Sequence, residues 1–177
     1  MTREVELDLM LYRLDGLFDP SFRDFLVKDG FINAPASTKY HGDYPGGLFD
    51  HSRAVTDTLE NLTRCNGLSW QRPESPLIIG MFHDICKYDR YKLICDDNGV
   101  TRYDYINNTV LQGHGAKSVM ILAQFMRLTE EEVLCIRYHM GAYETDDWDG
   151  FDRAIRKYPN VLWTHHADML ASKVIGK

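Results

Sequence analysis

Histidines and aspartates on the apolar faces of predicted helices constrain the fold of this chain more than any other feature of its sequence. In the helix predicted over residues 48–64, His51 lies one and two turns before Val55 and Leu59, on the same face. That face is expected to point into the core. An imidazole buried there without a hydrogen-bond partner would be costly. The fold must therefore supply partners for such side chains in its interior.

Further residues of this kind come from other predicted helices or from their buried ends. They are His83, Asp84, His114, His139 and Asp168. Any one of these histidines alone is readily explained as a core residue with its own hydrogen-bond partner. Burial of the whole set would require a separate partner for each side chain, whereas one shared metal centre satisfies them all. Sites built from imidazoles and carboxylates suit divalent Mn, Fe, Co, Ni or Zn better than Mg, which stays a candidate.

The hydrophobic pattern predicts an all-α fold with one small β-hairpin. Helices are expected over 20–28, 48–64, 75–82, 114–126 and 159–174. One more helix is expected to begin at residue 129, with His139 on its apolar face. The predicted strands, 91–95 and 100–105, are joined by a tight turn at 97–99, and a short acidic loop is expected over 144–150. No linker rich in Gly, Pro or Ser divides the chain, so residues 1–177 are expected to form a single domain.

The charge of the chain limits its partners. It contains 20 Lys and Arg against 26 Asp and Glu, a net charge of −6 at pH 7. This charge would repel duplex nucleic acid, and no run of Lys or Arg offsets it. The longest apolar run, residues 77–82, is far shorter than the roughly 20 residues that a membrane-spanning helix needs. The polar first residues form no signal sequence. We therefore expect a cytoplasmic protein that binds neither duplex nucleic acid nor membranes.

The four cysteines show no CxxC spacing. They are Cys65, Cys86, Cys95 and Cys135. This spacing favours reduced thiols buried in the core over disulfides or a zinc site. The cysteines are therefore expected to act as small apolar residues.

Five sequence elements occur in the order, and with the flanking residues, of one enzyme family. They are residues 46–52 (GGLFDHS), 83–87 (HDICK), 103–114 ending in Gly-His, 138–141 (YHMG) and 165–170 (HHADML). These elements resemble those of the HD-domain metal-dependent phosphohydrolases, and are most similar to the HD domain of the 3′–5′ exoribonuclease branch. The resemblance covers roughly residues 38–173. The chain departs from the branch at Cys86, Met140 and Ala171, where the branch has Gly, His and Asp.

The resemblance implies an HD-domain helical bundle with two divalent ions. The ligands of the first ion would be His51, His83, Asp84 and Asp168. Asp84 would bridge to the second ion, which His114 and His139 would complete. A hydroxide that bridges the two ions would attack the phosphorus of a phosphate ester, while the ions stabilise the developing charge.

Three further residues are predicted to act near the metal centre. Lys87, three residues after Asp84, matches the lysine of the family motif and would contact phosphate, or else it is a solvated lysine at a helix end. His41 precedes the Gly-Gly-Leu element, as a histidine does in the exonuclease branch. It either orients a ligand or contacts substrate, or else it is an ordinary loop residue. His165, three residues before Asp168, can face the site and orient a ligand.

The first functional hypothesis is a phosphohydrolase or phosphodiesterase that uses Asp84 and Lys87 in catalysis. Its substrate would be small and phosphorylated, with a nucleotide as the first candidate. A 3′–5′ exonuclease on short single strands would share the site, but it needs a basic and aromatic groove that the sequence does not reveal. A third alternative is a regulatory module that binds a nucleotide with little turnover, although the intact ligand set argues against it. The oligomeric state stays open, and a homodimer is one alternative.

Overall fold

The computed structural model describes residues 1–95, 99, 101–106, 113–141 and 147–176. Its helices are α1 (Arg3–Tyr12), α2 (Ser21–Lys28), α3 (Gly47–Asn66), α4 (Ser75–Phe82), the 3-10 helix η1 (Ile85–Asp89), α5 (His114–Leu122), α6 (Glu130–Arg137), α7 (Trp148–Lys157), α8 (Asn160–Leu170) and the π-helical turn η3 (Ala171–Ile175). Strands β1 (Tyr91–Cys95) and β2 (Thr101–Tyr105) form an antiparallel sheet. The prediction of a predominantly helical chain with a small hairpin is confirmed.

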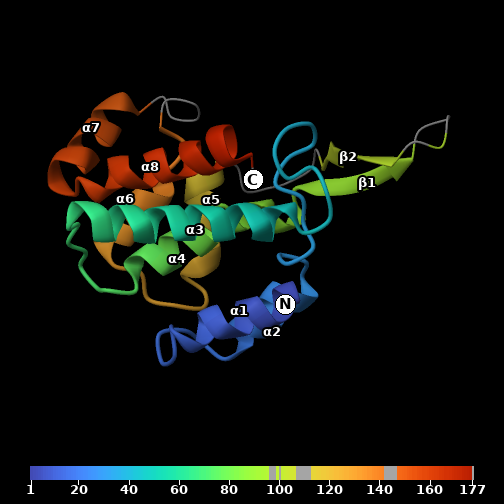
Figure 1. Cartoon of the computed structure of the whole chain (residues 1–177), viewed down its shortest axis with the longest axis horizontal. Coiled ribbons are helices and arrows are strands. Elements are labelled where there is room, and N and C mark those ends of the chain that lie inside the picture. The colour runs from blue at the N-terminus through green and yellow to red at the C-terminus, as the bar shows by residue number, and fades with distance from the viewer. Residues whose placement is uncertain (96–98, 100, 107–112, 142–146, 177) are drawn as a thin grey trace.

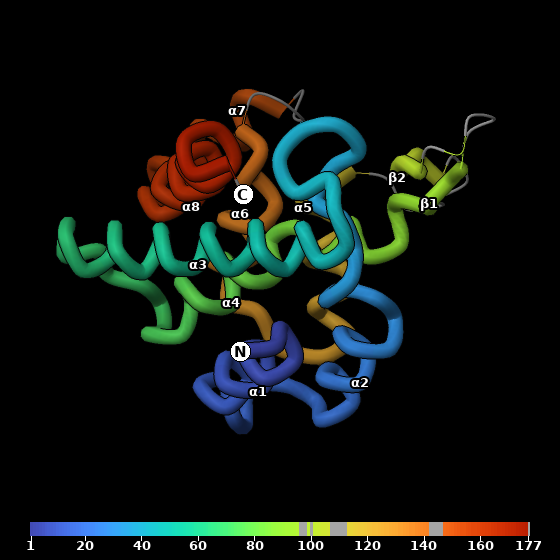
Figure 2. Tube along the Cα trace, turned by 45° about the vertical axis from the view of Figure 1, so that its right-hand side comes forward, coloured from blue at the N-terminus to red at the C-terminus, as the bar shows by residue number. Residues whose placement is uncertain are grey.

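The long helix α3 runs through the middle of the molecule (Figure 1). It packs against α4 on one side and against α8 on another, while α6 contacts α4, α5 and α8. Helices α1 and α2 lie together at the end that holds the N-terminus, and the β1–β2 hairpin projects from the helical body (Figure 2). The central position of α3 explains why residues of its first turns can meet residues from α4, α6 and α8.

Two glycines let the helices approach closely. A Cβ at Gly80 in α4 would lie 2.5 Å from Thr56 Cα in α3, so only glycine fits at this crossing. A Cβ at Gly115 in α5 would overlap the backbone of Arg137 at the end of α6. Because each glycine is close in sequence to a predicted ligand, these contacts draw His83 toward α3 and His114 toward α6.

The loop that leads into α3 is held in place by both backbone and side chains. Gly46 has φ +85°, a conformation that favours glycine, and it is followed by the first residue of α3. The guanidinium of Arg3 lies over Gly46 and donates to both carboxylate oxygens of Asp50, at 2.8 and 2.9 Å. Tyr44 donates its hydroxyl to the same carboxylate at 3.0 Å. The loop that carries His41 is thereby fixed against the start of α3.

Two helices, α1 and α7, are absent from the prediction. Helix α1 buries Leu7, Met10 and Leu11, but apolar residues on its exposed side, among them Val5 and Leu9, obscure this helical spacing in the sequence. The loop predicted over 144–150 is wrong at its end, because Asp147 accepts a hydrogen bond from Gly150 N at 2.9 Å and caps α7. Residues 142–146 of that loop lie outside the described residues.

Three helices end earlier than predicted. Helix α5 ends at Leu122 and not near 126, and α8 ends at Leu170, where η3 continues the chain. Helix α6 ends at Arg137, because Tyr138 leaves the helical conformation with φ −107° and ψ 14°. His139 therefore lies in the turn after α6, and its predicted place on a helical face is wrong.

The hairpin pairs β1 with β2 from Tyr91 opposite Tyr105 to Cys95 opposite Thr101. Most of the predicted turn at 97–99 lies outside the described residues. Two cysteines, Cys86 and Cys135, are buried as predicted, but Cys65 and Cys95 are exposed. Among the helices of the described ranges, none combines the length and the apolar character that crossing a membrane requires.

Replacement of Gly80 by Ala tests the close contact between α3 and α4. We expect Gly80→Ala to lower the free energy of unfolding by about 1–3 kcal/mol, because the added methyl group overpacks a buried crossing. Urea unfolding monitored by circular dichroism measures this. Because the overlap includes the backbone of Thr56, the added change Thr56→Ala should not restore stability. An unchanged unfolding midpoint in Gly80→Ala would show that the crossing is not tight.

Candidate metal centre

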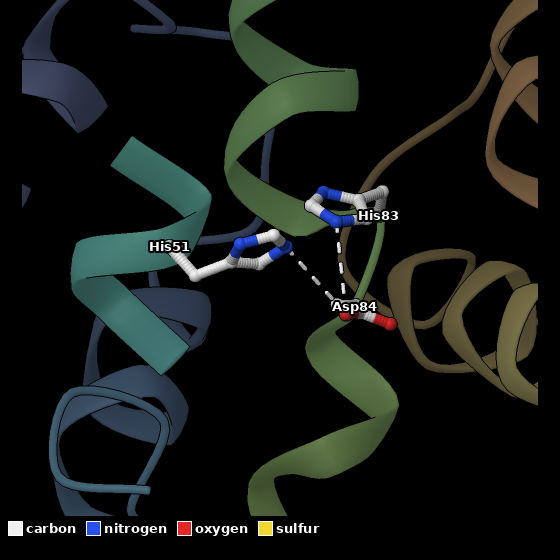
Figure 3. A group of neighbouring side chains, drawn as sticks. All are labelled: His51, His83 and Asp84. Carbon is white, nitrogen blue, oxygen red and sulfur yellow. Dashed lines mark ion pairs between the residues drawn. The ribbon is translucent and has the colours of Figure 1, made fainter. Parts of the chain in front are cut away.

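Five of the predicted ligands form a buried cluster with the Asp84 carboxylate at its centre. His51 belongs to the second turn of α3, His83 directly follows α4, and Asp84 precedes η1. His139 lies in the turn after α6, and Asp168 belongs to α8. None of the five is more than 8% exposed. In Figure 3, His51 and His83 extend from different helices toward Asp84. The fold therefore brings residues from distant parts of the sequence into one cluster.

Imidazole nitrogens and carboxylate oxygens lie close together in this cluster. His51 Nε2 is 3.2 Å from Asp168 Oδ1 and 3.9 Å from Asp84 Oδ2. His83 Nε2 is 3.7 Å from Asp84 Oδ2 and 4.0 Å from Asp168 Oδ1, and His139 Nε2 is 3.3 Å from Asp84 Oδ1. Ligands that bind one ion at about 2.0–2.2 Å are separated by similar distances. The three imidazoles and two carboxylates can therefore share metal ions.

The two rings of His83 and His139 are oriented by backbone carbonyls. His83 Nδ1 lies 2.9 Å from Gly80 O, and His139 Nδ1 lies 2.7 Å from Ile136 O. Because a carbonyl oxygen only accepts, each Nδ1 carries the proton and donates it. In its neutral form each ring presents the lone pair of Nε2 to the cluster. The Asp84 carboxylate outweighs burial and raises the pKa of His139, so an ion that binds this ring would displace a proton. Metal-binding histidines commonly have their second nitrogen held in this way.

Nε2 of both rings faces carboxylate oxygens, and for the neutral ring of His83 an acceptor therefore faces acceptors. Within the described residues, the buried atoms His83 Nε2, His139 Nε2 and Asp84 Oδ1 make no hydrogen bond. Buried polar atoms in native proteins nearly always have a partner. A cation between the nitrogens and the carboxylates would supply a partner for all three atoms. The donor set therefore fits divalent metal ions, and the groups His51–His83–Asp84 and His83–His139–Asp168 each place ligand atoms within 4.8 Å of one another.

Protonation of these groups also suits metal binding. Burial lowers the pKa of His83 to about 4, so this ring is neutral near pH 7. Burial alone would raise the pKa of Asp84, but the ammonium of Lys87 and the neighbouring imidazoles outweigh burial and hold the pKa well below its usual range. Burial alone would raise the pKa of Asp168, but the imidazoles of His51, His83 and His139 together outweigh it and lower this pKa. The cluster therefore combines charged carboxylates with a neutral imidazole.

Two more predicted residues adjoin Asp84. His114 begins α5 and is partly exposed, with its Nδ1 3.7 Å from Asp84 Oδ1. Lys87 lies on η1, whose period of three residues per turn places it on the same side as Asp84. Its Nζ is 2.6 Å from Asp84 Oδ2, and the residue is only 8% exposed. The alternative of a solvated lysine at a helix end is therefore wrong.

A cavity connects the cluster with the surface. Asp84, Asp168 and Lys87 line its inner end, and the exposed Lys173 lines its outer end. The partly buried side chains of His41 and His165 also line the cavity. A molecule that enters the cavity can thus reach the carboxylates and the buried lysine.

His41 and His165 both lie next to predicted ligands. The ring centres of His41 and His51 are 5.0 Å apart, and burial lowers the pKa of His41 to about 4, so its ring is neutral near pH 7. His165 Nδ1 donates to the carbonyl oxygen of His139 at 2.7 Å. Gly141 makes room for this ring, because a Cβ there would lie 2.8 Å from His165 Cε1. His165 therefore orients the turn that carries His139.

Some residues at the site are absent from the prediction. Ser172 and Lys173 line the cavity, and Cys86 lies beside His114, with Cys86 Sγ 3.8 Å from His114 Nδ1. Ser172 stands one helical turn after Asp168, so the helical period could have placed it on the same face. For Lys173 and Cys86 the sequence carries no such signal, because their positions depend on η3 and on the start of α5.

Comparison with known proteins identifies no relative. No protein-family model, curated protein or solved structure shows significant similarity to the chain. The interpretation of the site therefore depends on its own geometry and on the sequence elements that carry the family resemblance.

Metal binding should stabilise the folded chain, because it satisfies buried atoms that lack hydrogen bonds. An ion that binds only the folded state adds about 2.7 kcal/mol at a concentration one hundred times its Kd. We expect Tm to rise when Zn²⁺ or Mn²⁺ is added to chelator-treated protein and to fall again after removal of the metal. Differential scanning calorimetry measures both changes. An identical Tm with and without metal, at proven occupancy, would contradict this expectation.

Proposed function

We propose that this chain is a divalent-metal-dependent phosphohydrolase with an HD-type helical bundle, acting on a small phosphorylated substrate. The observation that carries the proposal is the convergence of buried imidazoles and carboxylates on Asp84, beside a buried lysine, at the inner end of a cavity. A set of core histidines with unrelated roles does not account for ring nitrogens that face carboxylates without hydrogen bonds. A phosphate ester that enters the cavity would meet both metal ligands and a cation.

The ligands divide into two groups around Asp84. His51 and His83 lie nearest Oδ2, and both also face Asp168 Oδ1, whereas His114 and His139 lie nearest Oδ1 of Asp84. A carboxylate with different partners at its two oxygens is suited to bridging two ions. Bound divalent ions would activate the attacking water and neutralise charge on the phosphoryl oxygens.

Lys87 would bind and orient the phosphoryl group. Its Nζ lines the cavity 2.6 Å from Asp84 Oδ2. The Asp84 carboxylate outweighs the effect of burial and raises the pKa of Lys87, so the ammonium stays charged throughout the physiological range. A fixed positive charge at this point stabilises negative charge that develops on phosphoryl oxygens during hydrolysis.

The outer end of the cavity favours a nucleotide among phosphorylated substrates. Lys173 Nζ lies 6.0 Å from the ring centre of Tyr40, and this tyrosine is 76% exposed. Lys173 could pair with a phosphate, and the exposed ring of Tyr40, which adjoins Lys173 but does not line the cavity, could stack on a base. The net charge of −6 disfavours long nucleic acids as substrates. Rates on nucleoside mono-, di- and triphosphates and on short oligonucleotides, with each candidate metal, test this assignment.

Variants of Asp84 test the proposed bridge. We expect Asp84→Asn to lose both ions and to lower phosphoesterase activity by more than about 100-fold, the upper end of losses caused by changes next to metal ligands. His139→Ala should lose mainly one ion, because it contacts only one oxygen of Asp84. Metal content per chain and hydrolysis rates are measured together. The control is Glu132→Gln, which alters a buried carboxylate paired with Arg72. Full metal content in Asp84→Asn would contradict the proposal.

Replacement of Lys87 separates phosphate binding from metal binding. Lys87→Met keeps much of the side-chain volume but removes the charge, so we expect normal metal content and a loss of about 100-fold in kcat. Lys117→Met is the matched control, because Lys117 is equally buried but pairs with Asp89, and it does not line the cavity. If Lys87→Met kept its turnover, Lys87 would serve only to balance the charge of Asp84.

A further inference from the structure

Cys86 lies among groups that bind metals. It is the second residue of η1, two residues after Asp84, and it is 1% exposed. Cys86, Asp84 and His114 each offer one ligand atom, and these three atoms lie within 4.8 Å of one another. A thiol in this position contributes a donor different in kind from the imidazoles and carboxylates of the rest of the centre.

The distances in this group are close to those around a tetrahedral ion. Cys86 Sγ is 3.8 Å from His114 Nδ1, which is itself 3.7 Å from Asp84 Oδ1. Bonds of about 2.3 Å to sulfur and about 2.0–2.1 Å to nitrogen or oxygen separate tetrahedral ligands by roughly 3.3–3.6 Å. The third separation, between Cys86 Sγ and the ligand oxygen of Asp84, is at most 4.8 Å, so side-chain shifts of up to about an ångström would bring the three atoms into the coordination shell of one ion.

A second observation points to a ligand here. Asp84 Oδ1 faces this group, and it is buried without a hydrogen bond, although His139 Nε2 and His114 Nδ1 lie 3.3 and 3.7 Å away. An ion that satisfies this oxygen between Asp84 and His114 would lie within reach of the sulfur of Cys86. A cation between the sulfur, the imidazole and the carboxylate satisfies all of them.

We infer that the thiolate of Cys86 is a ligand of the ion held by Asp84 and His114, and that this position selects a thiophilic divalent ion. This inference rests on the proposed metal centre. Thiolates favour Zn²⁺ and other borderline ions over Mg²⁺ and Mn²⁺, which prefer oxygen ligands. Binding converts the thiol into a metal-bound thiolate and releases its proton to solvent. The ion on the Asp84–Cys86–His114 side is therefore Zn²⁺, Fe²⁺ or Co²⁺.

Cobalt absorption spectroscopy tests the inference directly, because a thiolate ligand gives Co²⁺ a charge-transfer band in the near ultraviolet. The test protein carries Cys65→Ser and Cys95→Ser, which remove the two exposed thiols. We expect this protein to show the band when Co²⁺ is added, and the further change Cys86→Ser to abolish it. Cys135→Ser is the matched control, since Cys135 is also buried but belongs to α6 and to none of the candidate metal-binding groups in the described residues. It should keep the band.

The possible outcomes separate this inference from the proposed function. Binding of Co²⁺ without a charge-transfer band would overturn the role of Cys86 and leave the metal centre in place. A band that persists in Cys86→Ser would also overturn it. Failure of the test protein to bind Co²⁺ at all would overturn both the proposed metal centre and this inference.

A measurement on the unaltered chain covers the case in which Cys86→Ser fails to fold. X-ray absorption at the zinc edge, on protein loaded with Zn²⁺, reports the ligand atoms around the ion. We expect a sulfur neighbour at about 2.3 Å in addition to nitrogen and oxygen at about 2.0–2.2 Å. A shell of nitrogen and oxygen alone would overturn the inference. The same measurement on protein that carries Cys65→Ser, Cys95→Ser and Cys135→Ser, in which Cys86 is the one remaining cysteine, assigns the sulfur to Cys86.

Discussion

The burial of the Asp84 carboxylate is the constraint on which the rest of the structure depends. The residue is 2% exposed and its carboxyl group is charged, and a charge removed from water is costly unless other groups compensate it. Lys87 provides one compensating charge, and imidazoles from α3, α5 and the ends of α4 and α6 surround the carboxylate. The core of the helical body is therefore organised around a polar centre. The close helix contacts at Gly80 and Gly115 help to bring the imidazoles of His83 and His114 toward this carboxylate.

Much of the site could be predicted from the sequence, because its ligands lie in or next to regular helices. The period of α3 placed His51 on a buried face, and the apolar run of α4 placed His83 at a buried end. The position of His139 could not be predicted in the same way, because Tyr138 ends α6 one residue earlier. Helix α7 could not be predicted either, since an acidic run is typical of loops and only the hydrogen bond from Gly150 to Asp147 makes it a helix start. The role inferred for Cys86 depends on its distance to His114, which lies on another helix.

Residues outside the cluster fix the geometry of the site. Arg3 and Tyr44 both bind Asp50, and they thereby hold the loop with His41 against α3. On the opposite side, His165 holds the turn that contains His139. Because these contacts hold the side chains in place beforehand, the side chains would need little rearrangement to bind a metal ion or a phosphate. The cavity with Lys87 at one end and Lys173 at the other would give the proposed phosphorylated substrate access to this arrangement.

Anomalous diffraction from crystals loaded with Zn²⁺ tests the central claim, which is that the cluster around Asp84 is a metal centre. The account predicts strong anomalous peaks on both sides of the Asp84 carboxylate. The Nε2 atoms of His83 and His139 should lie about 2.0–2.1 Å from these peaks. Anomalous peaks elsewhere on the protein, with Asp84 still paired only with Lys87 and its neighbouring imidazoles, would contradict the claim.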